Sequence, residues 1–217
     1  MKLFIDSGNI KDIETLAAIG IIDGVTTNPT LLAKEPGDYR DNLKKICQIV
    51  KGPVSGEVTA VDVNGMLQQG HDIAKIDQYM VVKVPLTRAG IQACKALSGE
   101  GIRVNVTLCF SAAQALLAAK AGATYISPFV GRLDDVGTTG MALIKEIVEI
   151  YNNYDFTTEI LVASCRNPIH VIEAARMGAD VATCPPAVID QLFNHPLTNI
   201  GLEKFLKDWE KSQTVKA

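Results

Sequence analysis

Histidine and aromatic residues are scarce in this sequence, and its charges nearly balance. Its 217 residues include three His, one Trp and 6% aromatic residues in all, and the formal net charge is −3. A chain with so little net charge has no electrostatic attraction to polyanions, so we expect no nucleic-acid partner and no anionic membrane surface as partner. No Cys/His set has zinc spacing and no glycine-rich nucleotide loop is present, so we expect no metal and no cofactor.

Disulfides, leader segments and membrane spans are not expected either. The cysteines are odd in number and form no Cys-x-x-Cys pair: Cys47, Cys94, Cys109, Cys165 and Cys184. Free thiols fit a reducing compartment. Asp6 interrupts the first apolar run before it reaches the length of a signal peptide, and no apolar stretch approaches the length of a membrane span. We therefore expect a cytoplasmic protein.

What the sequence does contain is one repeated unit: a short β-branched apolar run, a turn, and a stretch with helical periodicity. Because no linker divides the chain, we predict a single domain over residues 1–217. The predicted strands are residues 3–6, 22–26, 54–58, 80–84, 104–108, 124–128, 160–164 and 180–183. The predicted helices are residues 10–19, 39–50, 63–75, 89–97, 112–121, 141–151, 169–177 and a C-terminal helix, 202–211.

Strict alternation of strands and helices predicts a parallel sheet, and strands this apolar indicate burial on both faces. Eight units close naturally into a (β/α)8 TIM barrel of the α/β class, here with an extra C-terminal helix. An open, doubly wound sheet is the alternative. Polar side chains follow nearly every apolar run, and only the run VATCPP is poor in them. Residues spread over so many strand ends favour the barrel, whose active site lies at that end.

Lys83 is the strongest single indication of chemistry. It lies in the middle of MVVKVP, where alternation places it on the same face as Val81. Lysine is rarely buried without a reason, and a desolvated lysine is biased toward the neutral amine that attacks carbonyl carbon. A lysine that extends to solvent from a strand end is the alternative. Carboxylates on two other strands, Asp6 and Glu57, favour the nucleophile because aldol chemistry also needs proton transfer.

Further polar residues suit a phosphorylated sugar. Asn105 and Thr107 alternate with apolar neighbours and should point into the mouth, where they can bind hydroxyl groups. Asn28 precedes Pro29 and is also a natural helix cap. Arg132 and Arg166 follow two strands and together indicate an anionic group such as phosphate. Ion pairing of Arg132 with Asp134 or Asp135 is the alternative for that residue.

These residues together resemble the transaldolase family, in its small-subunit branch, over essentially the whole chain. The most specific stretches are GVTTNPTLL at 24–32, VVKVPLT at 81–87, ISPFVGRLDD at 126–135 and ASCRNPIHV at 163–171. The resemblance implies a Schiff-base transferase of the pentose phosphate pathway. Such an enzyme moves a dihydroxyacetone unit from sedoheptulose 7-phosphate or fructose 6-phosphate to glyceraldehyde 3-phosphate or erythrose 4-phosphate. It also implies a homo-oligomer, a pentamer or decamer joined through the C-terminal helix.

The resemblance assigns a role to each site residue. Lys83 would form the Schiff base with the ketose C2, and Asp6 would handle the proton of the cleaved C4 hydroxyl. Glu57 and Thr107 would act through a water while the Schiff base forms. The predicted substrate-binding residues, on the sugar hydroxyls or the phosphate, are Thr26, Asn28, Asn105, Ser127, Phe129, Arg132, Ser164 and Arg166.

Three other functions compete with this prediction. The related fructose-6-phosphate aldolases share the barrel and the lysine, but they typically have Gln in place of Glu57 and Tyr in place of Phe129. Both differences favour transfer over simple aldol cleavage. A phosphate-binding barrel isomerase would not need an interior lysine, and a non-catalytic barrel would have no reason to keep a full set of polar strand ends.

Overall fold

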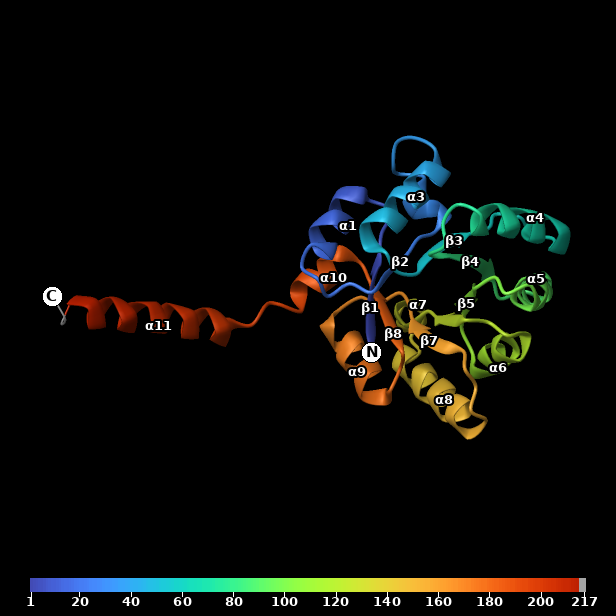
Figure 1. Cartoon of the computed structure of the whole chain (residues 1–217). Coiled ribbons are helices and arrows are strands. Elements are labelled where there is room, and N and C mark those ends of the chain that lie inside the picture. Colours follow the sequence, from blue (N-terminus) through green and yellow to red (C-terminus); the bar gives the residue numbers. More distant parts are fainter. Residues whose placement is uncertain (215–217) are drawn as a thin grey trace.

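The computed structural model describes residues 1–214 and consists of a closed barrel and a projecting C-terminal helix. Eight strands follow one another in chain order around the barrel, and all neighbouring pairs are parallel (Figure 1). The predicted (β/α)8 barrel is therefore confirmed. The strands are β1 (Lys2–Asp6), β2 (Gly24–Thr26), β3 (Val54–Glu57), β4 (Met80–Pro85), β5 (Val104–Cys109), β6 (Tyr125–Pro128), β7 (Glu159–Val162) and β8 (Val181–Cys184).

Helices surround the strands (Figure 1). They are α1 (Ile10–Ala17), α2 (Pro29–Leu32), α3 (Tyr39–Val50), α4 (Val63–Ala74), α5 (Arg88–Gly99), α6 (Ala112–Ala121), α7 (Val130–Asp135), α8 (Gly140–Asn153), α9 (Pro168–Met177), α10 (Pro186–Gln191) and α11 (Pro196–Thr214). The long amphipathic helices were predicted. The short helices α7 and α10 were not, because six residues are too few to show a helical period, and of α2 only the start at Asn28 and Pro29 was predicted.

Glycines follow several helical stretches in the sequence, and three of them mark helix ends in the structure. Gly122 and Gly178 are the C-caps of α6 and α9, and both adopt the left-handed conformation at φ 86° that glycine tolerates. Helix α5 ends at Gly99, with Glu100 as its C-cap. Gly20 is not a C-cap, because α1 ends at Ala17 and is capped by Ala18.

Two apolar layers hold the barrel together. The larger lies between strands and helices and includes Val82, Val84 and Ile126. The smaller fills the barrel interior and consists of Phe4, Val81, Tyr125, Leu161, Ala163 and Val181, with Phe129 packed against it. Because side chains alternate along a strand, a residue two positions beyond each interior residue faces the same way. That step reaches Asp6 beyond Phe4, Lys83 beyond Val81, Ser127 beyond Tyr125 and Thr183 beyond Val181.

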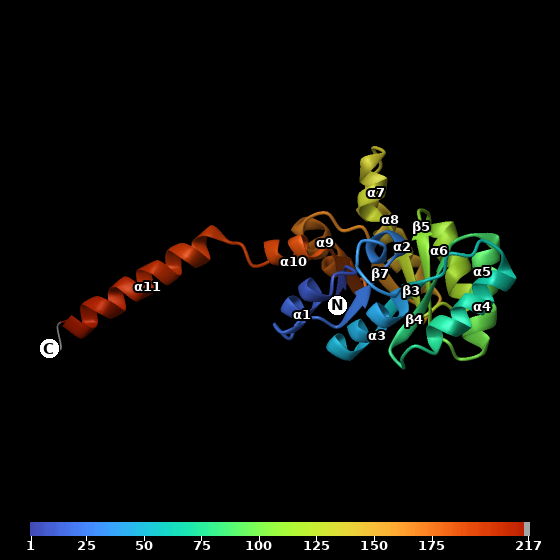
Figure 2. The ribbon, with the colours of Figure 1, turned by 90° about the horizontal axis from the view of Figure 1, so that it is seen from above.

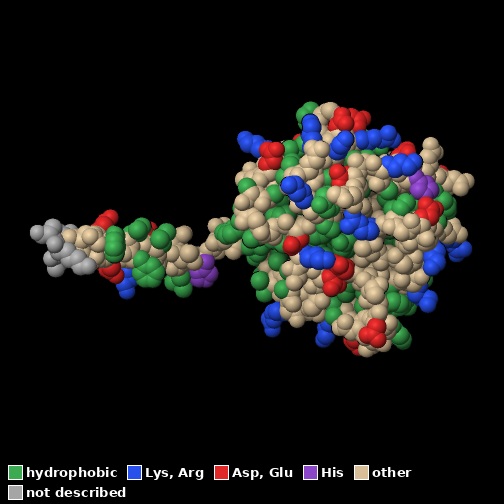
Figure 3. Space-filling model, viewed as in Figure 1, with side chains coloured by type: hydrophobic (Ala, Val, Ile, Leu, Met, Phe, Trp, Pro, Cys, Tyr) green, Lys and Arg blue, Asp and Glu red, His purple; other side chains and the backbone are tan. Residues whose placement is uncertain are grey.

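Helix α11 extends away from the barrel, as both ribbon views show (Figures 1 and 2). It begins at Pro196, earlier than the predicted 202–211. Its large apolar side chains are between 54% and 71% exposed: Leu197, Ile200, Leu202, Phe205, Leu206 and Trp209. The space-filling view shows them along the projecting helix (Figure 3). This apolar face therefore does not pack on its own barrel. Over residues 1–214, no helix has the length and apolarity to cross a bilayer.

Candidate active site

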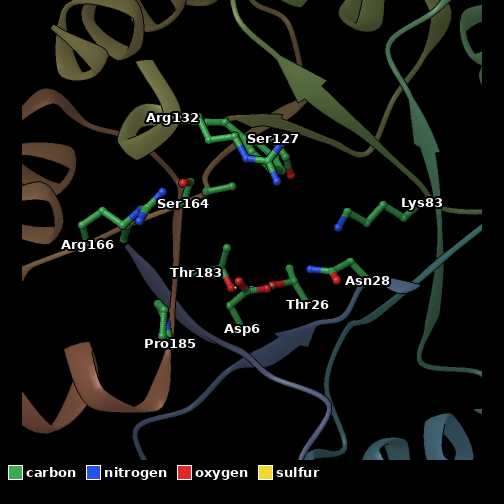
Figure 4. A pocket seen from close by; sticks show the side chains of 13 residues that line it. Asp6, Thr26, Asn28, Lys83, Ser127, Arg132, Ser164, Arg166, Thr183 and Pro185 are labelled. Atoms are coloured by element: carbon green, nitrogen blue, oxygen red, sulfur yellow. Dashed lines mark hydrogen bonds between the residues drawn. The ribbon is translucent and has the colours of Figure 1, made fainter. Parts of the chain in front are cut away.

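The carboxyl ends of the strands surround a cavity of about 260 Å³. Most of the predicted site residues line it, and Figure 4 shows eight of them converging on one space: Asp6, Thr26, Asn28, Lys83, Ser127, Arg132, Ser164 and Arg166. Phe129 also lines this cavity. An adjoining hollow of about 430 Å³ adds Glu57 and Thr107 and shares Lys83 and Phe129 with the first. Of the predicted residues, Asn105 lines neither hollow.

Lys83 reaches into this cavity from β4. Its side chain is 5% exposed, and its Nζ lies 2.9 Å from Oε2 of Glu57. The barrel produces this pair directly, because Glu57 on β3 is opposite Lys83 in the parallel register. The Nζ also donates to the Thr27 carbonyl oxygen at 2.9 Å. A buried amine beside a carboxylate has a partner that can take or return its proton.

The Asp6 carboxylate on β1 is linked to two hydroxyl groups on the neighbouring strands β2 and β8. Thr26 Oγ1 donates to Asp6 Oδ1 at 2.7 Å and lies 2.6 Å from Thr183 Oγ1. Burial raises the pKa of Asp6 above its usual value, while Lys83 and the Thr26 hydroxyl act against that shift. Thr183 lines the cavity, so the expectation that the run VATCPP contributes little to the mouth was wrong.

Asn105 is opposite Lys83 in the register of β4 and β5, and it acts on the cavity through its neighbours. It is fully buried, its Nδ2 donates to Ser55 Oγ at 3.1 Å, and its Oδ1 accepts from Ser127 Oγ at 2.8 Å. These partners fix the orientation of the amide. The structure therefore places Asn105 under Ser127, where it holds that serine at the cavity wall.

Thr107 and Asn28 present polar groups to the hollow that Lys83 also lines. In the part of the chain that the structure describes, Oγ1 of Thr107 is buried and has no hydrogen-bond partner. Buried hydroxyl groups normally have one, so this oxygen is suited to a bound molecule. Asn28 Oδ1 accepts from Leu31 N at 2.9 Å and caps α2, as predicted. Figure 4 shows its amide nitrogen toward the cavity.

The two arginines lie on the side of the cavity opposite Lys83 (Figure 4). Arg132 belongs to α7, and its guanidinium carbon lies 5.3 Å from the centre of the Phe129 ring. Arg166 Nη2 lies 2.8 Å from Asp135 Oδ2 in an exposed ion pair. The suggested pairing of Arg132 with Asp134 or Asp135 is wrong, because Asp135 pairs with Arg166 and Asp134 with His170. Arg132 is therefore available to an anion.

Ser164 connects the two arginine-bearing segments in a strained conformation. Its φ is 60°, a region that residues other than glycine seldom adopt. Its carbonyl oxygen accepts from Gly131 N at 3.1 Å. A Cβ at Gly131 would collide with that oxygen and lie 2.6 Å from Arg166 Nε. The close approach that glycine allows thus brings α7 against the turn after β7.

Cys165 lines the cavity between Ser164 and Arg166 and is fully buried. The neighbouring Cys184 thiol and burial both raise its pKa well above that of a free thiol. It is therefore held as a neutral thiol, which suits a packing role.

Fold and site together define a class of protein: a (β/α)8-barrel enzyme with a buried lysine between carboxylates and two arginines across one cavity. A family model described as Transaldolase/Fructose-6-phosphate aldolase matches residues 3–216. The chain belongs to this family, and the resemblance seen in the sequence is confirmed.

Curated relatives agree with this assignment. A protein of Anaeromyxobacter dehalogenans (strain 2CP-C) named "Probable transaldolase" is 60% identical over 211 residues, which cover 97% of each chain. A protein of Methanococcus vannielii with the same name is 57% identical over 210 residues, covering 97% of this chain and 98% of its own. A protein of Rhodospirillum centenum with the same name is 59% identical over 213 residues, which cover 98% of this chain and 92% of its own. Family and relatives support an enzyme of the aldolase and transferase type.

Proposed function

We propose that this protein is a transaldolase that carries a dihydroxyacetone unit on Lys83 between sugar phosphates. The observation that supports this most strongly is the buried Lys83 amine, 2.9 Å from Glu57, at the cavity that Asp6 also lines. Lysine in such surroundings is the nucleophile for a carbonyl carbon. The proposed substrates are sedoheptulose 7-phosphate or fructose 6-phosphate as donor and glyceraldehyde 3-phosphate or erythrose 4-phosphate as acceptor.

The first half of the reaction builds the Schiff base. The neutral Lys83 amine attacks C2 of the ketose, and the carbinolamine then loses its hydroxyl group as water. Glu57 takes the proton that leaves the Lys83 ammonium group, and it then supplies this proton for the departure of the hydroxyl through a water that also contacts Thr107, whose buried hydroxyl lacks any partner among residues 1–214. The product is an iminium ion on Lys83, which draws electrons from the neighbouring carbon–carbon bond.

The second half breaks and remakes that bond. Asp6 takes the proton of the C4 hydroxyl, the bond between C3 and C4 breaks, and its electron pair passes to the iminium nitrogen. The aldose phosphate leaves, and an enamine remains on Lys83. Addition of the enamine carbon to the aldehyde of the acceptor reverses these steps. Burial raises the pKa of Asp6 above its ordinary value, which makes this carboxylate a better acceptor for the C4 proton.

The remaining residues bind and orient the substrate. Asn28 and Ser127 line the cavity near Lys83 and suit the dihydroxyacetone hydroxyl groups. Arg132, Ser164 and Arg166 lie across the cavity, where a phosphate several carbons away from C2 would reach them (Figure 4). Phosphate binding by guanidinium groups is charge-assisted and can be bidentate. Fructose-6-phosphate aldolase activity is the alternative, and the apolar ring of Phe129 beside Lys83 favours transfer over release.

The exposed apolar face of α11 supports a homo-oligomer, a pentamer or a decamer, as a further part of this proposal. Apolar side chains on a projecting helix are stabilised when a second surface covers them. The pentose phosphate pathway and the cytoplasmic location stay predictions that rest on resemblance and on the free cysteines.

Trapping of the Schiff base tests the proposal. Incubation with fructose 6-phosphate and borohydride should leave a reduced adduct on the peptide that contains Lys83, located by mass mapping. Lys83→Met keeps an apolar stem and should abolish both the adduct and transfer. Lys120→Met is the matched control, because Lys120 is exposed at the end of α6. An adduct on another lysine would overturn the assignment.

A further inference from the structure

His170 lies outside the proposed chemistry, yet it connects two parts of the phosphate side of the cavity. It belongs to the first turn of α9 and is 8% exposed. Its Nδ1 accepts a hydrogen bond from the backbone N–H of Arg166 at 3.2 Å. Its Nε2 lies 3.0 Å from Oδ2 of Asp134, near the end of α7. One imidazole ring therefore bridges the backbone of one arginine and the helix that carries the other.

These two contacts require one protonation state of the ring. A backbone N–H can only donate, so Nδ1 must carry no hydrogen. The ring hydrogen is then on Nε2, the nitrogen that lies 3.0 Å from Oδ2 of Asp134. The neutral Nε2–H tautomer thus agrees with both contacts, and the assignment rests on them.

Asp134 extends the link to a third helix. Its Oδ1 accepts from the backbone N–H of Gly140, the first residue of α8, at 2.8 Å. Thr139, the N-cap of α8, makes no side-chain capping bond, so Asp134 provides that acceptor instead. The two oxygens of one carboxylate therefore connect α7 to α8 and, through His170, to α9.

This link matters because α7 is short and projects beyond the barrel (Figure 2). A helix of six residues does not hold its conformation through its own hydrogen bonds, so it needs outside anchors. The other acidic anchor, the ion pair of Asp135 with Arg166, is exposed and uses the guanidinium group that a phosphate would attract. The His170–Asp134 contact uses no group that the phosphate needs.

We propose that His170 is a positioning residue: with Asp134 it fixes α7 against the Arg166 backbone, so that Arg132 and Arg166 converge on one substrate phosphate. The inference rests on the proposed phosphate role of the two arginines. Rigid placement of both guanidinium groups lowers the entropy lost on binding and so tightens phosphate binding. It predicts that changes at His170 affect phosphate affinity far more than the chemical step at Lys83.

The test uses the full chain and three variants. His170→Leu removes both contacts at similar volume. His170→Asn returns an amide acceptor near the position of Nδ1 but cannot reach Asp134. His71→Leu is the control, because His71 makes a histidine–carboxylate pair of the same kind, at 2.6 Å from Glu100, on the exposed surface. Calorimetry measures the affinity for inorganic phosphate, and steady-state kinetics with fructose 6-phosphate separate KM from kcat.

His170→Leu should weaken phosphate binding and raise KM about tenfold, with kcat changed less than about twofold. His170→Asn keeps only the contact with the Arg166 backbone, so it should recover about half of that loss in free energy and bind about threefold more weakly than the wild type, and His71→Leu should match the wild type. Unchanged phosphate affinity in His170→Leu, or a fall in kcat that His170→Asn does not repair, would overturn the inference.

Two further outcomes are decisive. If thermal unfolding shows that His170→Leu does not fold, His170→Asn decides alone: an affinity lowered about threefold supports the link, and an unchanged affinity overturns it. If the wild type binds neither inorganic phosphate nor fructose 6-phosphate, the proposed function fails, and the inference fails with it. That failure is visible in the wild type, whereas failure of the inference alone appears only in the variants.

Discussion

The hydroxyl group of Thr26 donates its hydrogen to Oδ1 of Asp6 at 2.7 Å. Because a hydroxyl has one hydrogen, the 2.6 Å contact between Thr26 and Thr183 requires Thr183 to be the donor. Both hydroxyl groups therefore orient toward the carboxylate. Thr183 stabilises the ionised form of Asp6 without touching it, because a hydroxyl that accepts a hydrogen bond becomes a stronger donor.

Thr183→Val tests this chain, since valine keeps the shape of the buried threonine and removes its hydroxyl. We expect kcat to fall about fivefold, which corresponds to about 1 kcal/mol for one hydrogen bond. The acid limb of the kcat profile should move to higher pH, because the ionised Asp6 loses support. Thr183→Ser restores a donor and should restore the profile. A Val variant with the wild-type profile would reduce Thr183 to a packing role.

Asp6→Asn should make the protein more stable at neutral pH and inactive in transfer. Burial raises the folded-state pKa of Asp6 above its ordinary value of 3.8. A carboxyl group with a raised pKa contributes stability below the unfolded value, and that contribution is lost as the pH rises through the folded value. The neutral amide avoids this loss, so Tm of the variant should exceed that of the wild type at pH 7.

The same difference in Tm should shrink as the pH falls through 3.8, because below that value Asp6 is protonated in the unfolded state as well as in the folded one. Asp190→Asn, at an exposed carboxylate on α10, is the control and should show no such pattern. A lower Tm for Asp6→Asn at pH 7 would mean that attraction to Lys83 outweighs burial, contrary to the expected direction.

Arg132→Ala should selectively weaken the binding of phosphorylated substrates. A lost charge-assisted contact of about 1.5–3 kcal/mol raises KM for fructose 6-phosphate about 10- to 100-fold, while an unphosphorylated ketose is little affected. Arg40→Ala serves as control, because Arg40 makes an exposed ion pair with Asp72. Steady-state kinetics with both ketoses measure the two KM values to be compared. Equal losses for the two would assign Arg132 a structural role.

The alternation of side chains made the barrel and Lys83 predictable from sequence. Val81 and Lys83 share the interior face, while Val82 and Val84 pack outward, as period two requires. Thr183 was not recognised because a threonine within an apolar run is also an ordinary strand former. Only the closed barrel, which pairs β8 with β1, brings it to the Thr26 hydroxyl.

The arginine partners were unpredictable for a different reason. Asp134 and Asp135 lie near Arg132 in sequence, but α7 directs them toward α9, so they meet His170 and Arg166. Such contacts depend on how the short α7 sits on the turn after β7, where Ser164 has a positive φ. A six-residue helix and a strained backbone leave no periodic pattern in a sequence.

Deletion of the residues after Gly201 should dissociate the proposed oligomer. It removes Leu202, Phe205, Leu206 and Trp209, which are spaced along one face of α11 and exposed on the single chain. Light scattering should show a pentamer or decamer for the full chain and smaller species for the truncated one. Lys207→Ala on the same helix is the control for helix content. A full-length protein that is monomeric would contradict the proposal.

Phe129→Tyr should shift the enzyme from transfer toward aldol cleavage. The Phe129 ring lines both hollows beside Lys83 and packs against Phe110 with ring centres 5.9 Å apart. In the proposed mechanism, an apolar ring offers no donor to water near the enamine, so protonation would be slow and the enamine would survive until an acceptor aldehyde arrives. A tyrosine hydroxyl can organise water or deliver that proton, and general acid catalysis of this kind contributes up to about 10² or more in rate. We expect free dihydroxyacetone release to rise and transfer to erythrose 4-phosphate to fall.

Phe110→Tyr adds the same hydroxyl to the neighbouring ring, which is 37% exposed and outside both hollows, and should leave the ratio of release to transfer unchanged. If Phe129→Tyr lowers Tm but keeps the wild-type ratio, the ring only packs the top of the barrel, and transfer must be favoured by another feature of the site.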